Sequence, residues 1–223
     1  MSLCSRYLIA ALLMQAGAGC SSPAPLSADA GTDSGDGGSI ALESGIGLLF
    51  RGEPSFAESF THNNNTISLE SVEFTIVDLR LIGDAASGDA RTRKEVVELE
   101  WNDESELPIG VGYELAPPGL YSRVRGTVVA FEIEGNVIVD GNPSVGFEVD
   151  QEGSVLAFEF ELDSSLDAGE ALVLGVTVDL QKITEEIPFE ELSIEEGKIE
   201  IEDGSEAMNK VEEKIREAFD LSD

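Results

Sequence analysis

The sequence predicts a mainly β protein: an antiparallel β-sandwich with one amphipathic helix at its C-terminus. Apolar and polar residues alternate in several segments, glycine-rich turn sequences separate these segments, and the apolar spacing becomes helical near the end. Alternation with a period of two places one face of a strand in the core and the other in water. Short strands joined by tight turns are typical of a sandwich.

The alternation is clearest in four segments. Their apolar residues are Val97, Leu99 and Trp101; Val129, Phe131 and Ile133; Leu156, Phe158, Phe160 and Leu162; and Leu172, Leu174, Val176, Val178 and Leu180. Between Val72 and Leu81 the apolar set changes face, which predicts a β-bulge near Ile76 or Val77. Acidic residues fill many intervening positions, so we expect them on the solvent face of the strands.

Turn sequences mark the expected strand ends. Glycine and asparagine favour tight turns between antiparallel strands. Hairpin turns are therefore predicted at Glu134-Gly135-Asn136, at Asp140-Gly141-Asn142-Pro143 and at Glu152-Gly153.

The C-terminal segment has a different spacing. Its apolar residues recur every three or four positions, at Met208, Val211, Ile215 and Phe219. Ser205 precedes them as an N-cap, because a serine hydroxyl can accept a bond from the first free backbone N–H groups. This predicts one amphipathic helix over residues 205–220, packed on the edge or rim of the sandwich.

The charge of the chain is strongly acidic. There are 45 Asp and Glu against 13 Lys and Arg, a net charge of −32 at pH 7. Such a field repels nucleic acids and anionic lipids, so we expect no nucleic-acid partner. The acids are interpreted as a solvated surface, with a cation-buffering surface or a face for a basic partner as the sharper alternatives.

The N-terminus has the order of a signal peptide. Arg6 precedes an apolar run from Tyr7 to Met14, and small residues follow from Ala16 to Gly19. The run is shorter than the ~20 residues that span a bilayer. Residues 1–19 are therefore predicted to be a cleaved signal peptide.

Cys20 is the candidate lipidation site. Gly17-Ala18-Gly19-Cys20 resembles the lipobox of bacterial lipoproteins, differing at Gly17, where the family carries an aliphatic residue. The resemblance implies acylation of Cys20 and a membrane anchor, and Ser21 implies the outer membrane of the cell envelope. Residues 20–39 then form the acylated cysteine and a flexible tether. Ala16-Gly17-Ala18 also fits an ordinary cleavage site, which would give a soluble periplasmic or secreted protein.

Residues 40–223 are predicted to be one acidic sandwich domain. They contain no cysteine, which excludes a disulfide or a thiolate metal site there. The turn at Leu115-Ala116-Pro117-Pro118-Gly119-Leu120-Tyr121 resembles that of bacterial lipoprotein β-sandwiches of unknown function and of the related transthyretin-like (prealbumin-like) sandwiches. The resemblance implies an exported sandwich in which Tyr121 starts a core strand, and it supplies no catalytic residues.

Few residues point to chemistry. The single histidine, His62, lies in a polar segment and is interpreted as an exposed loop residue, and the single tryptophan, Trp101, as a core or rim residue. No catalytic residue is predicted, and no cofactor apart from calcium as an alternative. Oxygen ligands suit calcium, and the candidate metal ligands are Glu185, Glu186, Glu190, Glu191, Glu195 and Glu196.

These observations predict a membrane-tethered, exported lipoprotein that acts as a non-catalytic binding or structural module. Its partner would be a protein or another component of the cell envelope. Two alternatives stay open. One is an extracytoplasmic hydrolase that uses paired carboxylates, and the other is a calcium-dependent adhesion module.

Overall fold

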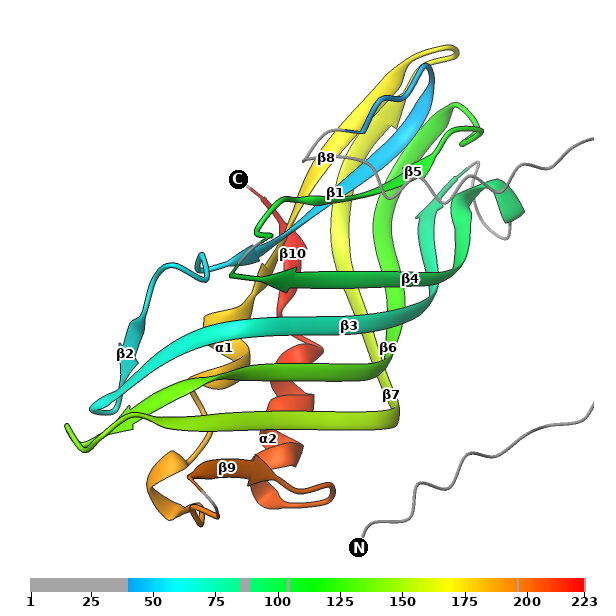
Figure 1. Ribbon diagram of the computed structural model, residues 1–223. Helices are drawn as coiled ribbons and strands as arrows, with labels where there is room; N and C mark the ends of the chain where they lie inside the picture. Colours follow the sequence, from blue (N-terminus) through cyan, green and yellow to red (C-terminus); the bar gives the residue numbers. More distant parts are fainter. Residues whose placement is uncertain (1–39, 85–88, 104, 196, 223) are drawn as a thin grey trace, which may run out of the picture. The chain divides into compact units, whose positions relative to one another are not determined.

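A computed structural model describes residues 40–84, 89–103, 105–195 and 197–222. The predicted signal peptide, Cys20 and the tether lie outside these residues. The described chain forms two β-sheets with few helices, which confirms the predicted β-sandwich class (Figure 1). The strands are β1 (Gly45–Glu53), β2 (Phe60–His62), β3 (Asn65–Gly83), β4 (Arg93–Asn102), β5 (Ile109–Tyr113), β6 (Gly119–Val139), β7 (Val145–Leu166), β8 (Ala171–Asp179), β9 (Lys198–Ile201) and β10 (Phe219–Leu221).

Each sheet mixes antiparallel and parallel pairs. The four-stranded sheet has the order β10-β8-β1-β5, and the six-stranded sheet has the order β2-β3-β6-β7-β9, with β4 also paired to β3. Most pairs are antiparallel, as the turn sequences predicted. The exceptions are β1 with β8 and β7 with β9, which run parallel.

Three strands of the six-stranded sheet are much longer than the sequence suggested. The turn at Asp140-Gly141-Asn142-Pro143 does join β6 to β7. The turns predicted at Gly135 and at Gly153 were wrong, because both glycines lie inside these strands. Gly135 makes room for a neighbouring strand, since a Cβ there would lie 2.4 Å from the Ser68 carbonyl oxygen. Gly153 has φ +78° beside a register shift between β6 and β7.

The predicted bulge in β3 is confirmed. The register against β6 shifts between Thr75 and Ile76 and again between Val77 and Arg80. Asp78 takes the extra position with φ +56°, a conformation that Asp and Asn tolerate better than most residues. The shift turns Leu79 and Leu81 into the core and explains why the apolar set changes face.

The predicted C-terminal helix is confirmed but shorter than expected. Helix α2 spans Glu206–Ile215, and the Ser205 hydroxyl accepts from the Met208 backbone N–H at 3.0 Å. Phe219 lies beyond it in β10, where its ring stacks on Phe158 with centroids 4.1 Å apart. The other helical segments are α1 (Leu180–Thr184), η1 (Ala90–Thr92) and η2 (Phe189–Glu191). No helix among the described residues is long and apolar enough to cross a membrane.

One continuous apolar core lies between the layers. Trp101 is 1% exposed, so it belongs to the core. Tyr121 is also buried near the start of β6, and its hydroxyl donates to the Pro117 carbonyl oxygen at 2.5 Å. The phenol thus fastens the Pro-Pro-Gly turn to the strand that follows it.

Candidate functional site

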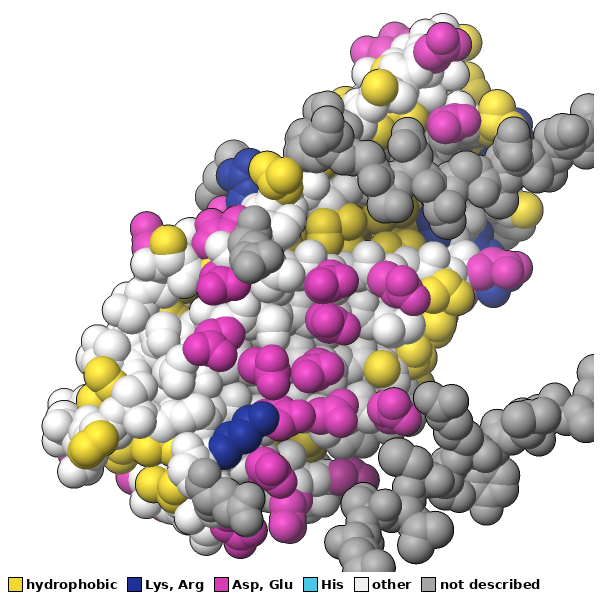
Figure 2. Space-filling model, viewed as in Figure 1, with side chains coloured by type: hydrophobic (Ala, Val, Ile, Leu, Met, Phe, Trp, Pro, Cys, Tyr) yellow, Lys and Arg dark blue, Asp and Glu magenta, His cyan; other side chains and the backbone are white. Residues whose placement is uncertain are grey.

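The outer face of the six-stranded sheet carries most of the candidate functional groups. Inward positions of its strands are buried and apolar, so the intervening acidic side chains point into solvent. We call this set the acidic face: Glu73, Glu98, Glu100, Glu132, Glu134, Glu148, Asp150, Glu152 and Glu200. In Figure 2, Asp and Glu side chains crowd over this part of the sheet.

The strand register places acids directly opposite one another. Glu100 of β4 pairs with Glu73 of β3, Glu73 pairs with Glu132 of β6, and Glu132 pairs with Asp150 of β7. Four adjacent strands therefore contribute one carboxylate each to a single row. Directly opposed residues have Cβ atoms about 5 Å apart, and like charges in such pairs destabilise a sheet.

A second row runs beside the first. Glu134 of β6 pairs with Glu148 of β7, and Glu148 pairs with Glu200 of β9. Ser71 continues the row on β3 and donates its hydroxyl to the Glu134 carboxylate at 3.1 Å. The two rows together give a flat surface of high negative charge density.

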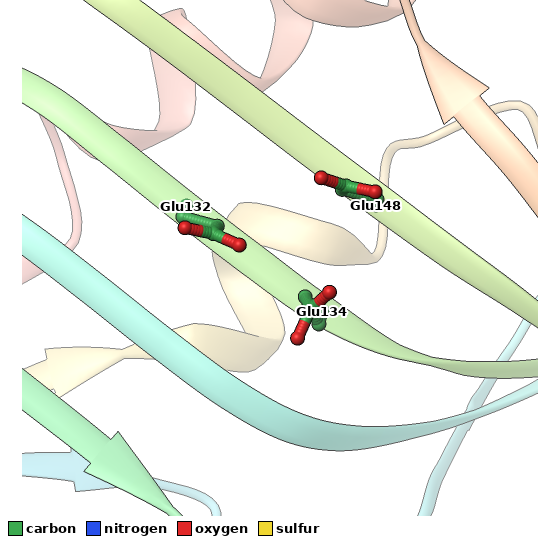
Figure 3. Close-up of side chains that lie close together, drawn as sticks. All are labelled: Glu132, Glu134 and Glu148. Atoms are coloured by element: carbon green, nitrogen blue, oxygen red, sulfur yellow. The ribbon is translucent and has the colours of Figure 1, made fainter. Parts of the chain in front are cut away.

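Glu132, Glu134 and Glu148 form the tightest group on this face. One carboxylate oxygen from each lies within 4.8 Å of the others, and Figure 3 shows the three side chains on β6 and β7. The spacing alone would suit a hard cation. However, the Lys198 ammonium ion-pairs with Glu148 and, at 3.7 Å, with Glu134. A protein cation already neutralises part of the group, which argues against a resident metal ion.

The charge density changes the ionisation of Glu132. Burial raises the pKa of its carboxyl group, and the neighbouring charges of Glu134, Glu73, Asp150 and Glu148 raise it further. The Glu148 carboxylate in turn raises the pKa of Lys198 and keeps that side chain charged. Glu132 therefore binds a proton more readily than an isolated glutamate does.

The shape of this face suits a broad contact. One hollow on it is a depression of about 170 Å³, lined by residues that include Glu73, Glu132, Asp150 and Glu152. General acid–base catalysis needs a substrate held in contact with the acid and the base. An open sheet surface offers multivalent electrostatic contact.

The structure disperses the predicted calcium ligands. Glu185 pairs with His62 at 3.7 Å, Glu186 pairs with Lys214 at 3.7 Å, and Glu190 accepts from the Asn65 amide. Glu191 and Glu195 line a cavity of about 270 Å³ that also includes Glu200 and Glu202. Glu196 lies outside the described residues. No three of the described candidates lie close enough together to form a ligand set.

His62 ends β2 and is about one-third exposed, so it is not the loop residue that we predicted. Its partner Glu185 caps the C-terminal end of α1. Among the described residues, no serine or cysteine nucleophile contacts the His62 ring. The arrangement is that of a partly exposed imidazole–carboxylate contact on the surface.

The comparisons with known proteins add no family to this geometry. No protein-family model, no curated protein and no solved structure matches the chain. The resemblances to the lipobox and to the transthyretin-like turn therefore stay predictions.

Proposed function

We propose that the chain is an exported lipoprotein, tethered to a membrane through Cys20, and that its acidic face binds a basic partner without catalysis. The observation that carries the proposal is the row of four opposed carboxylates on β4, β3, β6 and β7. Opposed like charges weaken the isolated domain. A bound cationic partner would replace this repulsion between carboxylates with attraction, which gives the row a function.

Two features favour a basic macromolecule over a calcium ion. The acids spread over five strands, which suits several cationic side chains better than one ion. Lys198 shows the contact on a small scale, since one ammonium group pairs with two carboxylates of the face. The predicted tether of residues 20–39 would hold the domain clear of the membrane, where its acidic face can reach a partner in the envelope.

Binding of the purified full chain to a lysine homopolymer tests the proposal. The variant Glu73→Gln/Glu132→Gln/Asp150→Asn should bind about tenfold more weakly at low ionic strength, since each exposed ion pair contributes roughly 0.2–1 kcal/mol. Added salt should weaken the parent more than the variant. Isothermal titration calorimetry measures both effects.

The matched control is Glu161→Gln/Asp163→Asn/Glu213→Gln, which removes the same charge from exposed positions outside the row. This control should retain at least half of the parent affinity. Equal loss in the two variants would mean that net charge alone drives the binding, and the proposed role of the row would be wrong.

A further inference from the structure

A row of arginines lies on the outer face of the six-stranded sheet, apart from the acidic rows. Arg93 of β4 pairs with Arg80 of β3, and Arg80 pairs with Arg125 of β6. Leu79 and Leu81 on either side of Arg80 are buried, so the row points to the same side of the sheet as the acidic rows. Each of these strands also contributes a glutamate to the row of four carboxylates, seven residues away along the chain (Figure 1). At ~3.3 Å per residue, the two rows lie about 20 Å apart along the strands.

The arginines lower the negative charge at this end of the face. The single carboxylate of Asp78 accepts from the other two guanidiniums of the row, at 2.8 Å from Nε of Arg80. Among the described residues, no hydrogen bond or ion pair engages Arg125. Glu159 continues the row on β7, but it already pairs with Arg123 at 2.9 Å. Arg125 therefore keeps its N–H donors for an oxoanion outside the chain.

Exposed apolar side chains lie beside these arginines. Leu120 is 58% exposed and lies three residues before Arg123 on β6. Ile82 pairs with Arg123 across the strands and is half-buried on the same face. Leu115, in the turn between β5 and β6, is 70% exposed. This end of the molecule thus combines guanidinium groups with apolar side chains in contact with solvent.

The turn that carries the two leucines is fixed to the sheet. The Tyr121 hydroxyl donates to the Pro117 carbonyl oxygen inside the turn. The Leu120 backbone N–H donates to the Asp84 carboxylate at 2.9 Å, and the Asp84 N–H donates back to the Leu120 carbonyl oxygen. The leucines are therefore presented to solvent on a support that needs little ordering before they bind a surface.

The described chain begins at the same end. Ile40 and Leu42 lie over glycines of β5, and the Ser44 hydroxyl donates to the carbonyl oxygen of Glu114, the residue before Leu115. The predicted flexible tether of residues 20–39 would have a root-mean-square reach of about 25 Å. An anchor at Cys20 can thus lie beside this turn.

A phospholipid bilayer matches this combination of groups. Guanidiniums bind phosphate groups through paired hydrogen bonds, and leucines are stabilised at the boundary between headgroups and acyl chains. Zwitterionic phospholipids present phosphates without a net negative charge. The net charge of −32 therefore does not oppose contact with them as it opposes contact with anionic lipids.

We infer that Arg125 and the neighbouring row of arginines bind phosphates of a zwitterionic phospholipid surface, while Leu115 and Leu120 enter its headgroup region. The inference rests on the proposed function in one respect, namely that the chain is tethered to a membrane. It adds an orientation, because the acidic rows would then lie about 20 Å along the strands from the bound arginines, open to a basic partner.

Quenching of tryptophan fluorescence by brominated lipid tests the contact, because the single tryptophan of the chain, Trp101, is buried. The mature protein purified from membranes is reconstituted into phosphatidylcholine vesicles with and without bromine on the acyl chains. The variant Leu115→Trp should lose about half of its added fluorescence in the brominated vesicles, since its ring enters the bilayer boundary. The matched control is Ile194→Trp, which should lose none. Ile194 is 57% exposed and precedes β9, beside the second acidic row.

Removal of the unpaired guanidinium tests the phosphate contact. Arg125→Gln in the Leu115→Trp protein should lower the ratio of docked to undocked chains about fivefold, the effect of one basic residue at a phospholipid surface. Arg51→Gln is the control, since Arg51 is also exposed and has no ion pair among the described residues, but lies six residues along β1 from Gly45, which touches the turn. This control should leave the quenching unchanged.

Unquenched fluorescence of the Leu115→Trp protein, equal quenching of the Ile194→Trp protein, or equal effects of the two arginine variants would each overturn the membrane contact. Binding of the lysine homopolymer is measured separately. If Glu73→Gln/Glu132→Gln/Asp150→Asn weakens that binding while the Leu115→Trp protein stays unquenched, only the membrane contact fails. If that triple variant keeps full affinity while the Leu115→Trp protein is quenched, the proposed role of the acidic row fails alone.

Discussion

Glu132 lies in the middle of the acidic face, with carboxylates on the strands to either side. Burial and these neighbours raise its pKa above the ordinary value of 4.5. The native state therefore holds this proton more tightly than the unfolded state does. The resulting stability is complete below the ordinary pKa and is lost as the pH rises through the raised pKa.

The variant Glu132→Gln should not lose stability in this way as the pH rises, because its side chain does not ionise. We expect the variant to be more stable than the parent at neutral pH by roughly 0.5 kcal/mol, because it removes like-charge contacts across the strands. Its free energy of unfolding should also fall less as the pH rises from just below to above 4.5. Urea unfolding at several pH values measures both. Glu98→Gln is the control, since Glu98 opposes the neutral Thr75, and an equal gain there would contradict the account.

The sequence alone predicts the structural role of a residue where the local pattern of apolar and polar residues determines that role. The change of apolar face located the bulge that Asp78 occupies. It could not reveal that the Asp78 carboxylate pairs with both Arg80 and Arg93 and that its pKa is lowered chiefly by the bond to Arg80. Arg93 comes from another strand, and its proximity depends on register.

Three glycines on β1 and β5 leave part of one face of the small sheet without side chains. Gly47 of β1 pairs with Gly112 of β5, and Gly110 lies two residues before Gly112 on the same strand. Ile40 and Leu42 lie over them, since a Cβ at Gly47 would meet both side chains within 3.0 Å. The absence of side chains thus lets the start of the described chain pack against the sheet.

Gly110→Ala should disturb this contact, because the added Cβ would lie 2.4 Å from Cγ1 of Ile40. We expect hydrogen exchange of the amides that pair β1 with β5, beneath Ile40 and Leu42, to become about tenfold faster while the large sheet is unaffected. Gly146→Ala is the matched control, since its nearest neighbours would be 3.9 Å away. Unchanged exchange in the Gly110 variant would show that the packing of Ile40 and Leu42 does not depend on a glycine at this position.

Glycine also explains where element prediction failed. A glycine beside Asn or Glu reads as a turn when only its neighbours in sequence are known. Gly135 instead admits the backbone of β3 and the ring of Phe147. The acidic rows were missed for a related reason: alternation predicts which acids face solvent, whereas only the pairing of strands determines which acids oppose one another.

Residues 1–39 predict that the protein is exported and lipidated at Cys20. The intact mass of the mature protein tests this prediction. We expect mature protein from membranes to begin at Cys20 and to carry added acyl mass. Cys20→Ser should abolish that mass and release the protein from membranes, because a single residue would carry the anchor. A mature chain that begins at Gly19 would contradict lipidation and support the ordinary cleavage site.

The parallel pairing of β1 and β8 imposes an order on folding. β3, β6 and β7 pair in the order in which the chain runs, whereas Gly45 of β1 finds its parallel partner only at Ala171. Contacts between distant segments form slowly, because a long intervening loop must close first. If the chain folds from its N-terminus, β1 therefore keeps one unpaired edge until β8 is available. The small sheet is complete only when β10 pairs with β8.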